Sequence, residues 1–420
     1  MKANRVDVLV AGAGPVGLAT ALFLMEHGRK VMVVDGKPRG VTHSYALALH
    51  PASLELLDTV GVAGDVLARA LPVRSLAIYA GSRRLTSVPV AAPGAKFPFL
   101  AVVGQEVLES VLGQVLEQRG MPVAWNHRLA RFSGTADAVV ADVDELEERV
   151  IGYAAARFDW LVKRTHAVEA QFLVGADGHD SLVRRQLDID FPEMQPAEHF
   201  AVFEFQRGDV AGDEIALVFH PDGLGVFWPL PGGRGRWSFA IDPKRSPEAW
   251  REKDHDPVQV VGPGVFPSLE EGMLQRLLAD RAPWSTARVN HIYWRMLVRF
   301  ERRIATTFGQ GRVWLAGDAG HLTGPAGIQS MNVGLREARD LALGLIAAER
   351  AGKPSDVLGQ YDAERLKEWR RLLGLSGRVE ATANASPEIA SWKDQVLACL
   401  PASGDALGSL MDRLGLRMTE

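Results

Sequence analysis

Three glycines near the N-terminus stand at a spacing that suits a dinucleotide phosphate. The segment reads Gly12-Ala13-Gly14-Pro15-Val16-Gly17, and Asp35 follows Gly17 by 18 residues. In such a turn the first glycine permits a tight bend, the second lets the backbone approach a pyrophosphate, and the third lets a helix pack closely on a strand. A helix N-terminus offers unpaired N–H groups to the phosphates, and a carboxylate can accept hydrogen bonds from ribose hydroxyls. These seven residues are therefore predicted to hold a dinucleotide, and Asp35 disfavours a 2′-phosphate.

Such a turn functions only between a strand and a helix. Residues 6–11 and 31–34 are β-rich, and residues 18–27 read as a helix that ends at Gly28. The uncharged run from Val8 to Met25 has the length of a membrane span and, with Lys2 and Arg5 ahead of it, resembles a signal peptide. The glycine turn divides that run into a strand and a helix, which favours a βαβ unit over both alternatives.

Composition narrows the class of protein. The 420 residues exceed what one core usually supports, so we expect two domains. Lysine plus arginine number 47 against 51 acidic residues, a net charge of −4 without the basic excess of a nucleic-acid binder. The single cysteine, Cys399, permits no intrachain disulfide and no cysteine-based zinc site. We therefore expect a cytoplasmic protein, monomer or homodimer, with no metal, no nucleic-acid partner and no membrane attachment.

Two further motifs lie far along the chain. One is Gly175-Ala176-Asp177-Gly178-His179-Asp180-Ser181-Leu182-Val183-Arg184, after a predicted strand. The other is Gly317-Asp318-Ala319-Gly320-His321, followed by Pro325-Ala326-Gly327-Ile328 and a long helical pattern at 329–350. Each Asp-Gly or Gly-Asp pair alone is a common turn. Asp318, at the end of a strand, can accept a hydrogen bond from a ligand hydroxyl, and the helix after Pro325 directs its N-terminal dipole at an electron-rich group.

The order of these motifs resembles the para-hydroxybenzoate hydroxylase family of single-component (group A), FAD-dependent aromatic monooxygenases, over roughly residues 6–345. The resemblance implies an α/β fold: a Rossmann-like (GR2-type) FAD-binding domain, an interleaved antiparallel-sheet substrate domain and C-terminal helices. It implies FAD as cofactor and NADH or NADPH as co-substrate. The implied reaction is hydroxylation of an aromatic or phenolic substrate, natural-product and polycyclic rings included, by O₂ through a flavin C4a-hydroperoxide.

The resemblance also assigns roles to single residues. Asp177 and its turn would lie near the pyrophosphate, Gln105 beside the flavin chain, and Gly317, Asp318, Pro325, Gly327 and Ile328 around the ribityl chain and ring. Candidate substrate contacts are Phe205, His220, Phe227, Trp228 and Pro325, and His220 is the one candidate for a catalytic polar group. The residues themselves do not identify the substrate, its regiochemistry or the catalytic base.

The expected domains are interleaved. Residues 1–72, 96–180 and 283–380 are predicted to form the FAD-binding domain, 73–95 and 181–282 the substrate domain, and 381–420 a helical tail of unassigned role. Residues 51–60 and 105–119 read as helices, 138–143 and 168–174 as short strands, 200–242 as an antiparallel sheet, and 262–267 as a surface loop.

The chain departs from the family at several positions. His43-Ser44-Tyr45-Ala46 stands where many members carry a flavin-contacting arginine, so Lys37 or Arg39 would have to supply that charge. Ile328 replaces a usual second glycine, and Glu337 a usual aspartate. Three alternatives stay open: a flavin-dependent halogenase, a flavin reductase of isoprenoid chains, and a flavin-binding protein without hydroxylase activity. No lysine occurs between Lys37 and Lys96 to serve as the halogenase lysine.

Overall fold

In the computed structural model, the glycine-rich turn joins a strand to a helix, as predicted. The structure describes residues 4–419 except 39–46, 93, 136, 152–156, 208–212, 243–258, 262–263, 267–268, 270–271, 286–288 and 353. Strand β1 (Asn4–Ala11) leads into α1 (Pro15–Glu26), and β2 (Val31–Asp35) pairs with β1 in parallel. The uncharged run is explained by burial, because residues 17–24 of α1 are all buried. Among the described helices, none has the length and apolar character needed to cross a membrane.

The first sheet has a parallel centre in the order β20-β11-β1-β2-β8. Its other members are β11 (Arg157–Gly175), β20 (Val313–Leu315) and β8 (Ala124–Trp125). β19 (Gly309–Gln310) closes one edge in antiparallel sense. The carboxyl ends of β1, β11 and β20 therefore lie side by side, and each runs into one of the three predicted motifs. This is the edge at which α/β sheets bind their ligands.

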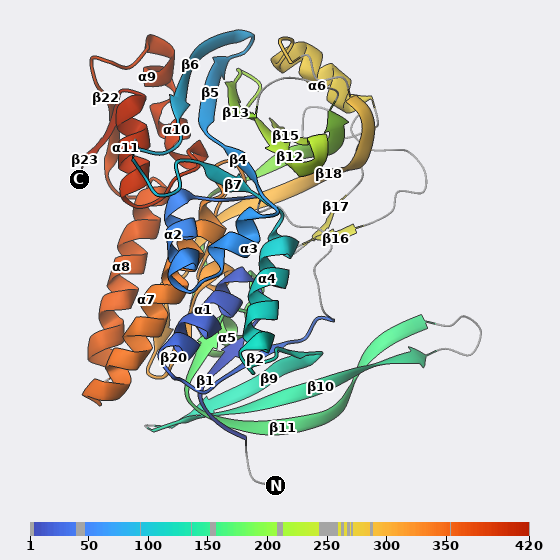
Figure 1. Ribbon diagram of the computed structural model, residues 1–420, viewed down its shortest axis with the longest axis vertical. Helices are drawn as coiled ribbons and strands as arrows, with labels where there is room; N and C mark the ends of the chain where they lie inside the picture. Colours follow the sequence, from blue (N-terminus) through green and yellow to red (C-terminus); the bar gives the residue numbers. More distant parts are fainter. Residues whose placement is uncertain are drawn as a thin grey trace.

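A three-stranded meander covers one face of that sheet. β9 (His127–Gly134), β10 (Val139–Ile151) and β11 pair in antiparallel order. A buried apolar cluster between the layers joins Leu9 and Val34 to Leu129 and Val143. The sequence predicted only short strands at 138–143 and 168–174, whereas the paired ribbon of β10 and β11 continues well beyond the body of the molecule (Figure 1).

Helices cover the opposite face. α1 packs against α4 (Gln105–Gln118) and α7 (Gln329–Ala351), and α7 packs against α8 (Pro354–Leu372). The predicted helices at 51–60, 105–119 and 329–350 are confirmed, the first as α2 (Pro51–Thr59), followed by α3 (Ala63–Leu67). A small sheet of β3 (Ala48–Leu49), β4 (Leu71–Val73) and β7 (Leu100–Val102) lies between this layer and the second sheet.

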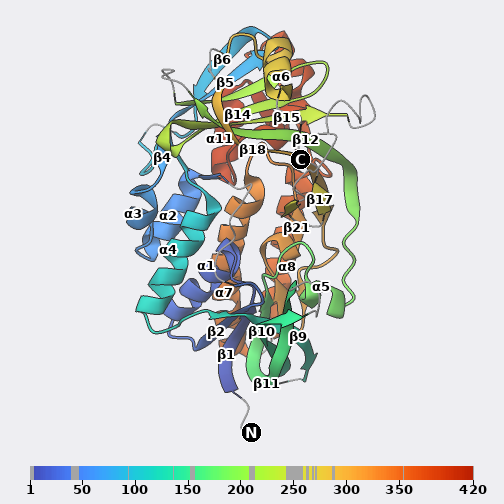
Figure 2. The same ribbon diagram turned by 90° about the vertical axis from the view of Figure 1, so that its right-hand side faces the viewer.

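The second sheet has eight strands and lies above the first in Figure 1. In sheet order they are β21 (His321–Leu322), β18 (Val289–Ile304), β12 (Glu193–Arg207), β15 (Arg234–Ile241), β14 (Gly225–Leu230), β13 (Glu214–Phe219), β5 (Ser75–Ala80) and β6 (Arg83–Pro89). Helix α6 (Met273–Arg281) covers its outer face (Figure 2). The antiparallel sheet predicted at 200–242 is confirmed, and residues 73–89 join it.

Two expectations differ from the structure. The first domain was expected to resume at residue 283, but β18 belongs to the second sheet as far as Ile304 because it pairs with β12 along its length. Within the segment 262–267, expected to be a surface loop, residues 264–266 form β17 (Gly264–Phe266), which pairs in antiparallel sense with β16 (Gln259–Val261) before the segment.

The tail after residue 375 is more than helices. It begins with β22 (Arg378–Ala381) and ends with β23 (Leu416–Thr419), and these two strands pair in antiparallel sense. Between them in the sequence lie the helices α9 (Pro387–Ser391), α10 (Lys393–Cys399) and α11 (Asp405–Arg413). Its apolar residues Leu397, Leu400 and Leu410 belong to the same buried cluster as α1 and α7. The tail is therefore an integral part of the core.

Candidate active site

The three glycines of the first turn have different surroundings. A Cβ on Gly12, whose φ is 105°, would lie 2.1 Å from the carbonyl oxygen of Ala176, and one on Gly17 would lie 2.0 Å from the carbonyl oxygen of Gly12. A Cβ on Gly14 would meet nothing within 4 Å. Gly12 and Gly17 are thus required by the protein's own packing, whereas Gly14 faces open space at the start of α1. No side chain caps α1 there, which leaves its first amides for a phosphate.

Asp35 lies at the end of β2 and holds the turn in place. Its carboxylate accepts hydrogen bonds from the backbone amides of Ala13 and Lys37, both at 2.8 Å. Each carboxylate oxygen has a second lone pair, so the same group can still accept from a ribose hydroxyl. Lys37, one of the two residues expected to supply the charge of the usual arginine, lies beside Asp35. Arg39, the other one, and residues 43–46 lie outside the described residues.

The second motif brings its backbone, rather than its carboxylate, to the turn. The amide nitrogen of Asp177 would be 2.9 Å from a Cβ on Gly12. Its side chain accepts from the Ser181 hydroxyl at 2.5 Å and the Val183 amide at 3.1 Å, and so caps the short helix α5 (Leu182–Gln186). Burial raises the pKa of Asp177 above its ordinary value, against these hydrogen bonds. Arg184 then ties this motif to the third by donating to the carbonyls of His179 and Ala319, both at 2.8 Å.

Asp318 is exposed at the start of the third motif, with a buried chain of polar groups behind it. The Ser330 hydroxyl donates to its Oδ1 at 2.7 Å and lies 3.3 Å from Nδ1 of His321. Nε2 of His321 is 2.9 Å from Oε2 of Glu337, and both side chains are fully buried. Glu337 also accepts from the Gly317 amide at 2.8 Å and the Trp369 indole at 2.7 Å. Glu337, one carbon longer than the usual aspartate, thereby spans the motif and α8.

The loop before α7 is held in an unusual conformation. Ile328 is the N-cap of α7 with φ 48°, in the left-handed region that favours glycine. No side chain caps the helix there. The free amides at this end are positioned for an electron-rich group beside Pro325. Gln105 lies at the first turn of α4, where its side chain donates to Glu109 at 2.7 Å.

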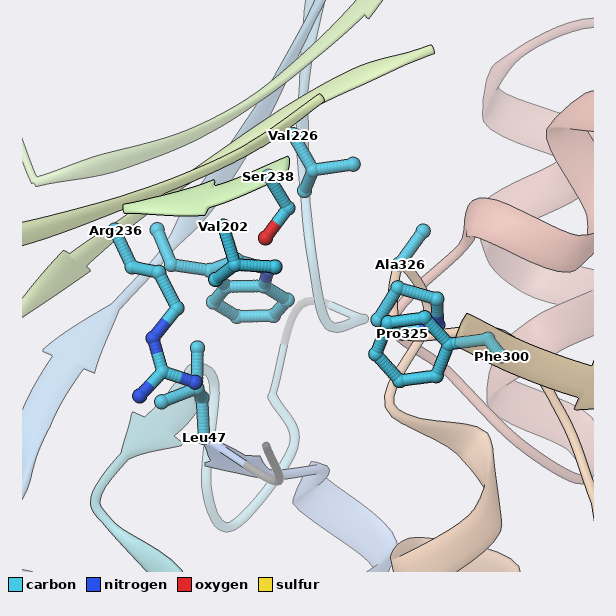
Figure 3. Close-up of a pocket in the computed structure, with 9 residues that line it drawn as sticks. Leu47, Val202, Val226, Arg236, Ser238, Phe300, Pro325 and Ala326 are labelled. Atoms are coloured by element: carbon cyan, nitrogen blue, oxygen red, sulfur yellow. The ribbon is translucent and has the colours of Figure 1, made fainter. Parts of the chain in front are cut away.

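A pocket separates this loop from the second sheet. Figure 3 shows Arg236 and Ser238 extending from β15, with Val202 and Val226 from neighbouring strands, toward Pro325 and Ala326 of the loop. The lining is completed by three apolar residues, Leu47, Trp228 and Phe300. Arg236 is buried and donates to Glu204 at 2.9 Å; Glu204 also accepts from Arg234 at 2.8 Å and the Trp294 indole at 3.1 Å. The described lining is thus apolar apart from one guanidinium and one hydroxyl.

Two of the predicted substrate residues line this pocket, Trp228 and Pro325, and three do not. Phe205 and Phe227 lie on the other face of the second sheet, in the apolar cluster under α6. Neighbouring residues of a strand point to opposite faces, so Phe227 and Trp228 could not both face the pocket. His220 follows β13 and borders a separate surface hollow with Gly81, Asp280 and Trp392. Its Nδ1 accepts from the Asp222 amide at 3.2 Å, so the candidate for a catalytic group is remote from the pocket.

Several pocket residues were not predicted. Arg236 and Ser238 alternate with Trp237 along β15, and Arg236 is directly opposite Trp228 in the sheet. The period-two pattern of Arg234-Gly235-Arg236-Trp237-Ser238 was the available signal. Which face would meet the flavin motifs depends on how the two sheets pack, which the pattern alone does not specify.

A comparison with known families agrees with this geometry. The family model described as FAD binding domain matches residues 5–375. The chain belongs to the FAD-binding domain family. FAD is the cofactor that members of this family bind, and the residues fit it: an uncapped helix and an open Gly14 for the pyrophosphate, an exposed Asp318 for the ribityl chain, and the α7 N-terminus for the ring.

Relatives with assigned names are monooxygenases. The chain is 30% identical over 379 residues to a 6-methylpretetramide 4-monooxygenase of Streptomyces rimosus, covering 89% of this chain and 61% of the relative. It is 27% identical to a para-nitrophenol 4-monooxygenase of Pseudomonas sp. (strain WBC-3), covering 86% and 82%. The chain spans under two thirds of the length of the first of these.

Solved structures show the same fold. A p-nitrophenol 4-monooxygenase from Pseudomonas putida DLL-E4 superposes with a TM-score of 0.68 at 22% identity, over 98% of this chain and 94% of that one. A ternary complex of aklavinone-11 hydroxylase with FAD and aklavinone gives a TM-score of 0.65 at 26% identity, over 89% and 68%. Structures with this architecture thus include a p-nitrophenol 4-monooxygenase and a hydroxylase whose complex contains FAD and aklavinone.

Proposed function

We propose that this protein is an FAD-dependent monooxygenase that hydroxylates an aromatic substrate bearing an acidic oxygen, with NADH or NADPH and O₂ as co-substrates. The observation that carries the proposal is the pocket between the loop of Pro325 and the second sheet, whose described lining is apolar except for Arg236 and Ser238. Relatives named as monooxygenases of para-nitrophenol and of 6-methylpretetramide support the same chemistry.

The residues around the pocket have distinct tasks in this proposal. Bound FAD supplies the redox chemistry, accepting a hydride and activating O₂. Gly12, Gly14, Gly17 and the start of α1 hold the pyrophosphate, and Asp318 orients the ribityl chain. The amides before Gln329 stabilise negative charge at the edge of the ring.

The substrate side of the pocket excludes water and orients the ring. Val202, Val226, Trp228 and Phe300 would surround the substrate with apolar surface, which protects reactive species from water. The cavity between them is about 10 Å³, so the loop and the sheet must move apart to admit a ring. Glu204 pairs with both Arg234 and Arg236, and this pairing holds the Arg236 guanidinium at the pocket wall. Arg236 would hold the ionised oxygen of a phenol or enol, and an ionised oxygen enriches the ring in electrons for attack. Ser238 would donate or accept one further hydrogen bond.

The test begins with the purified full-length protein. It should be yellow, with FAD bound; a colourless preparation that FAD cannot reconstitute would reject the proposal. The bound form should then oxidise NADH or NADPH faster with phenols present, and ¹⁸O₂ should label the hydroxylated product. Products without label, or halogenated products when chloride is supplied, would favour the alternative reactions.

The proposal also covers the cellular location and the oligomeric state of the protein. The chain has one cysteine, Cys399, which is buried. A chain that cannot form an internal disulfide is consistent with a cytoplasmic protein. The reaction as proposed needs a small-molecule substrate and O₂, and it places no requirement on a second subunit.

A further inference from the structure

The loop that would receive the flavin ring is in contact with the tail, which lies beyond the family match. The match ends at residue 375, yet a Cβ on Gly327 would lie 2.8 Å from the carbonyl oxygen of Leu400 and 3.0 Å from that of Ala398. The buried side chain of Gln329 donates to the carbonyls of Leu397 and Leu400, both at 3.4 Å. The segment from α10 to Ser403 therefore supports the loop from behind.

His50 connects the tail, the loop and α7. Its imidazole is fully buried, with Nε2 3.1 Å from the Gly327 carbonyl and Nδ1 3.4 Å from the Ser403 hydroxyl. A carbonyl only accepts, so Nε2 carries the proton and Nδ1 accepts from Ser403. The His50 amide donates to Asn332 at 2.7 Å, and Asn332 donates in turn to the Ile328 carbonyl at 2.8 Å.

The same contacts explain how the strained residue persists. A β-branched residue with positive φ is strained and is kept only where its surroundings fix it. Here both neighbours of Ile328 are fixed, Gly327 by His50 and the tail and Gln329 by the tail. The position that usually carries glycine in the family is thus occupied by isoleucine in the chain whose tail braces the loop.

We propose that residues 393–403 form a clamp on the flavin-ring loop, and that His50 is the positioning residue through which Ser403 fixes the Gly327 carbonyl. The proposal rests on the proposed position of the flavin ring. The neutral, Nε2-protonated form of His50 fits between the Gly327 carbonyl and the Ser403 hydroxyl, and burial, with the nearby charge of Arg336, lowers the pKa of the enclosed imidazole to about 3. Protonation therefore requires the clamp to open.

Amide hydrogen exchange of the full-length protein tests the clamp without relying on turnover. Peptides covering residues 324–333 would be followed with and without FAD in the wild type, Ser403→Ala and His50→Gln. Ser409→Ala is the matched control, because Ser409 is exposed on α11 of the same tail. Loss of one hydrogen bond should speed exchange of the loop about 2- to 10-fold in both clamp variants and leave the control unchanged.

The pH dependence distinguishes positioning from general stability. After correction for the intrinsic rate, exchange of the wild-type loop should speed up between neutral pH and about pH 5, because the open form can protonate His50; His50→Gln should lack this increase. Equal exchange in all four proteins, or the same pH response in His50→Gln, would overturn the clamp.

Exchange with FAD present separates the clamp from the proposed function. FAD should slow exchange of the loop, because the flavin ring would cover it. Failure to bind FAD would reject the proposed function, while the comparison of the four proteins without FAD would still decide whether the clamp exists. Binding of FAD without protection of the loop would reject the contact between the loop and the ring.

Discussion

Arg236 brings a permanent charge to an otherwise apolar pocket. Arg236→Met should weaken binding of ionised para-nitrophenol about 10- to 100-fold, as expected for a charged hydrogen bond, and change binding of neutral 4-nitroanisole little. Perturbation of the flavin absorbance by each ligand measures both. Arg234→Met is the control, because it removes the other arginine from Glu204 without altering the pocket lining. Equal losses for both ligands would show that Arg236 acts through packing alone.

Asp318 is the exposed member of the polar chain that ends at the buried Trp369. Asp318→Ala should weaken FAD binding about 10- to 100-fold, because a hydrogen bond between a carboxylate and a ribityl hydroxyl is lost. Titration of the apo protein with FAD, followed by flavin fluorescence, measures the affinity. Asp412→Ala, an exposed aspartate in the tail, should have no effect. Full FAD occupancy in Asp318→Ala would refute the assigned contact.

Glu337 gives stability a predictable pH dependence. Burial acts to raise its pKa, but the charges of His321 and Arg365 and the hydrogen bonds from His321 and Trp369 lower it below the ordinary 4.5. A depressed pKa contributes stability that is present above about pH 4.5 and is lost as the pH falls through the folded-state value. Glu337→Gln should lower the free energy of unfolding by about 3–5 kcal/mol at neutral pH and narrow that difference in acid. Urea unfolding at several pH values measures the free energy of unfolding of both proteins, with the exposed Glu380→Gln as control. A difference between wild type and Glu337→Gln that stays constant at every pH would contradict the lowered pKa of Glu337.

At the scale of elements, α1 and α7 meet at Gly334 of α7. A Cβ on Gly334 would lie 2.6 Å from Cγ2 of Val16, which stands at the start of α1. Gly334→Ala should therefore shift the phosphate-binding turn and lower both FAD affinity and Tm, although alanine favours a helix by about 1 kcal/mol. Gly359→Ala in α8 has open space around it and should raise the Tm slightly. Calorimetry and FAD titration of the two variants check this, and a stabilised Gly334→Ala with normal FAD affinity would contradict it.

The elements that the sequence predicted well are those with a local signal. The glycine turn, the helical periodicity of α4 and α7, and the short buried strand before Asp318 all follow from residues near one another in the chain. The long ribbon of β10 and β11 was missed because its polar outer residues, such as Glu145 and Lys163, pair across the strands rather than along them. The β22–β23 pair was missed for a related reason, since its partners are about forty residues apart.

The site divides in the same way. The phosphate turn and Asp318 are recognisable from the sequence, because each motif is continuous. His50, Asn332 and Ser403 meet only through packing of α2, α7 and the tail, and no spacing in the sequence relates them. Phe205 and Phe227 were predicted on the wrong face of their strands, since aromatic character alone does not distinguish a core face from a pocket face.

At the scale of the whole molecule, one apolar cluster joins both sheets and the tail. It includes Val10 of the first sheet, Leu217 and Trp228 of the second, and Leu410 of the tail. We therefore expect the apo protein to unfold in a single transition, because the layers share this core. Circular dichroism and tryptophan fluorescence should give coincident thermal curves. Two separated transitions would show that the second sheet folds independently.

Because the parts of the site come from distant segments of the chain, they are synthesised at different times. Gly14 is synthesised well before β11, which pairs with β1, and β20, which pairs with β11; these strands and the motifs after them come from residues 157–175 and 313–318. Ser403, which braces the ring loop, follows Gly14 by nearly the whole chain. At about 5–20 residues per second, that interval is on the order of 20 to 80 s. A nascent chain therefore carries the phosphate turn long before it has a place for the ring, and the flavin is a ligand of the finished protein.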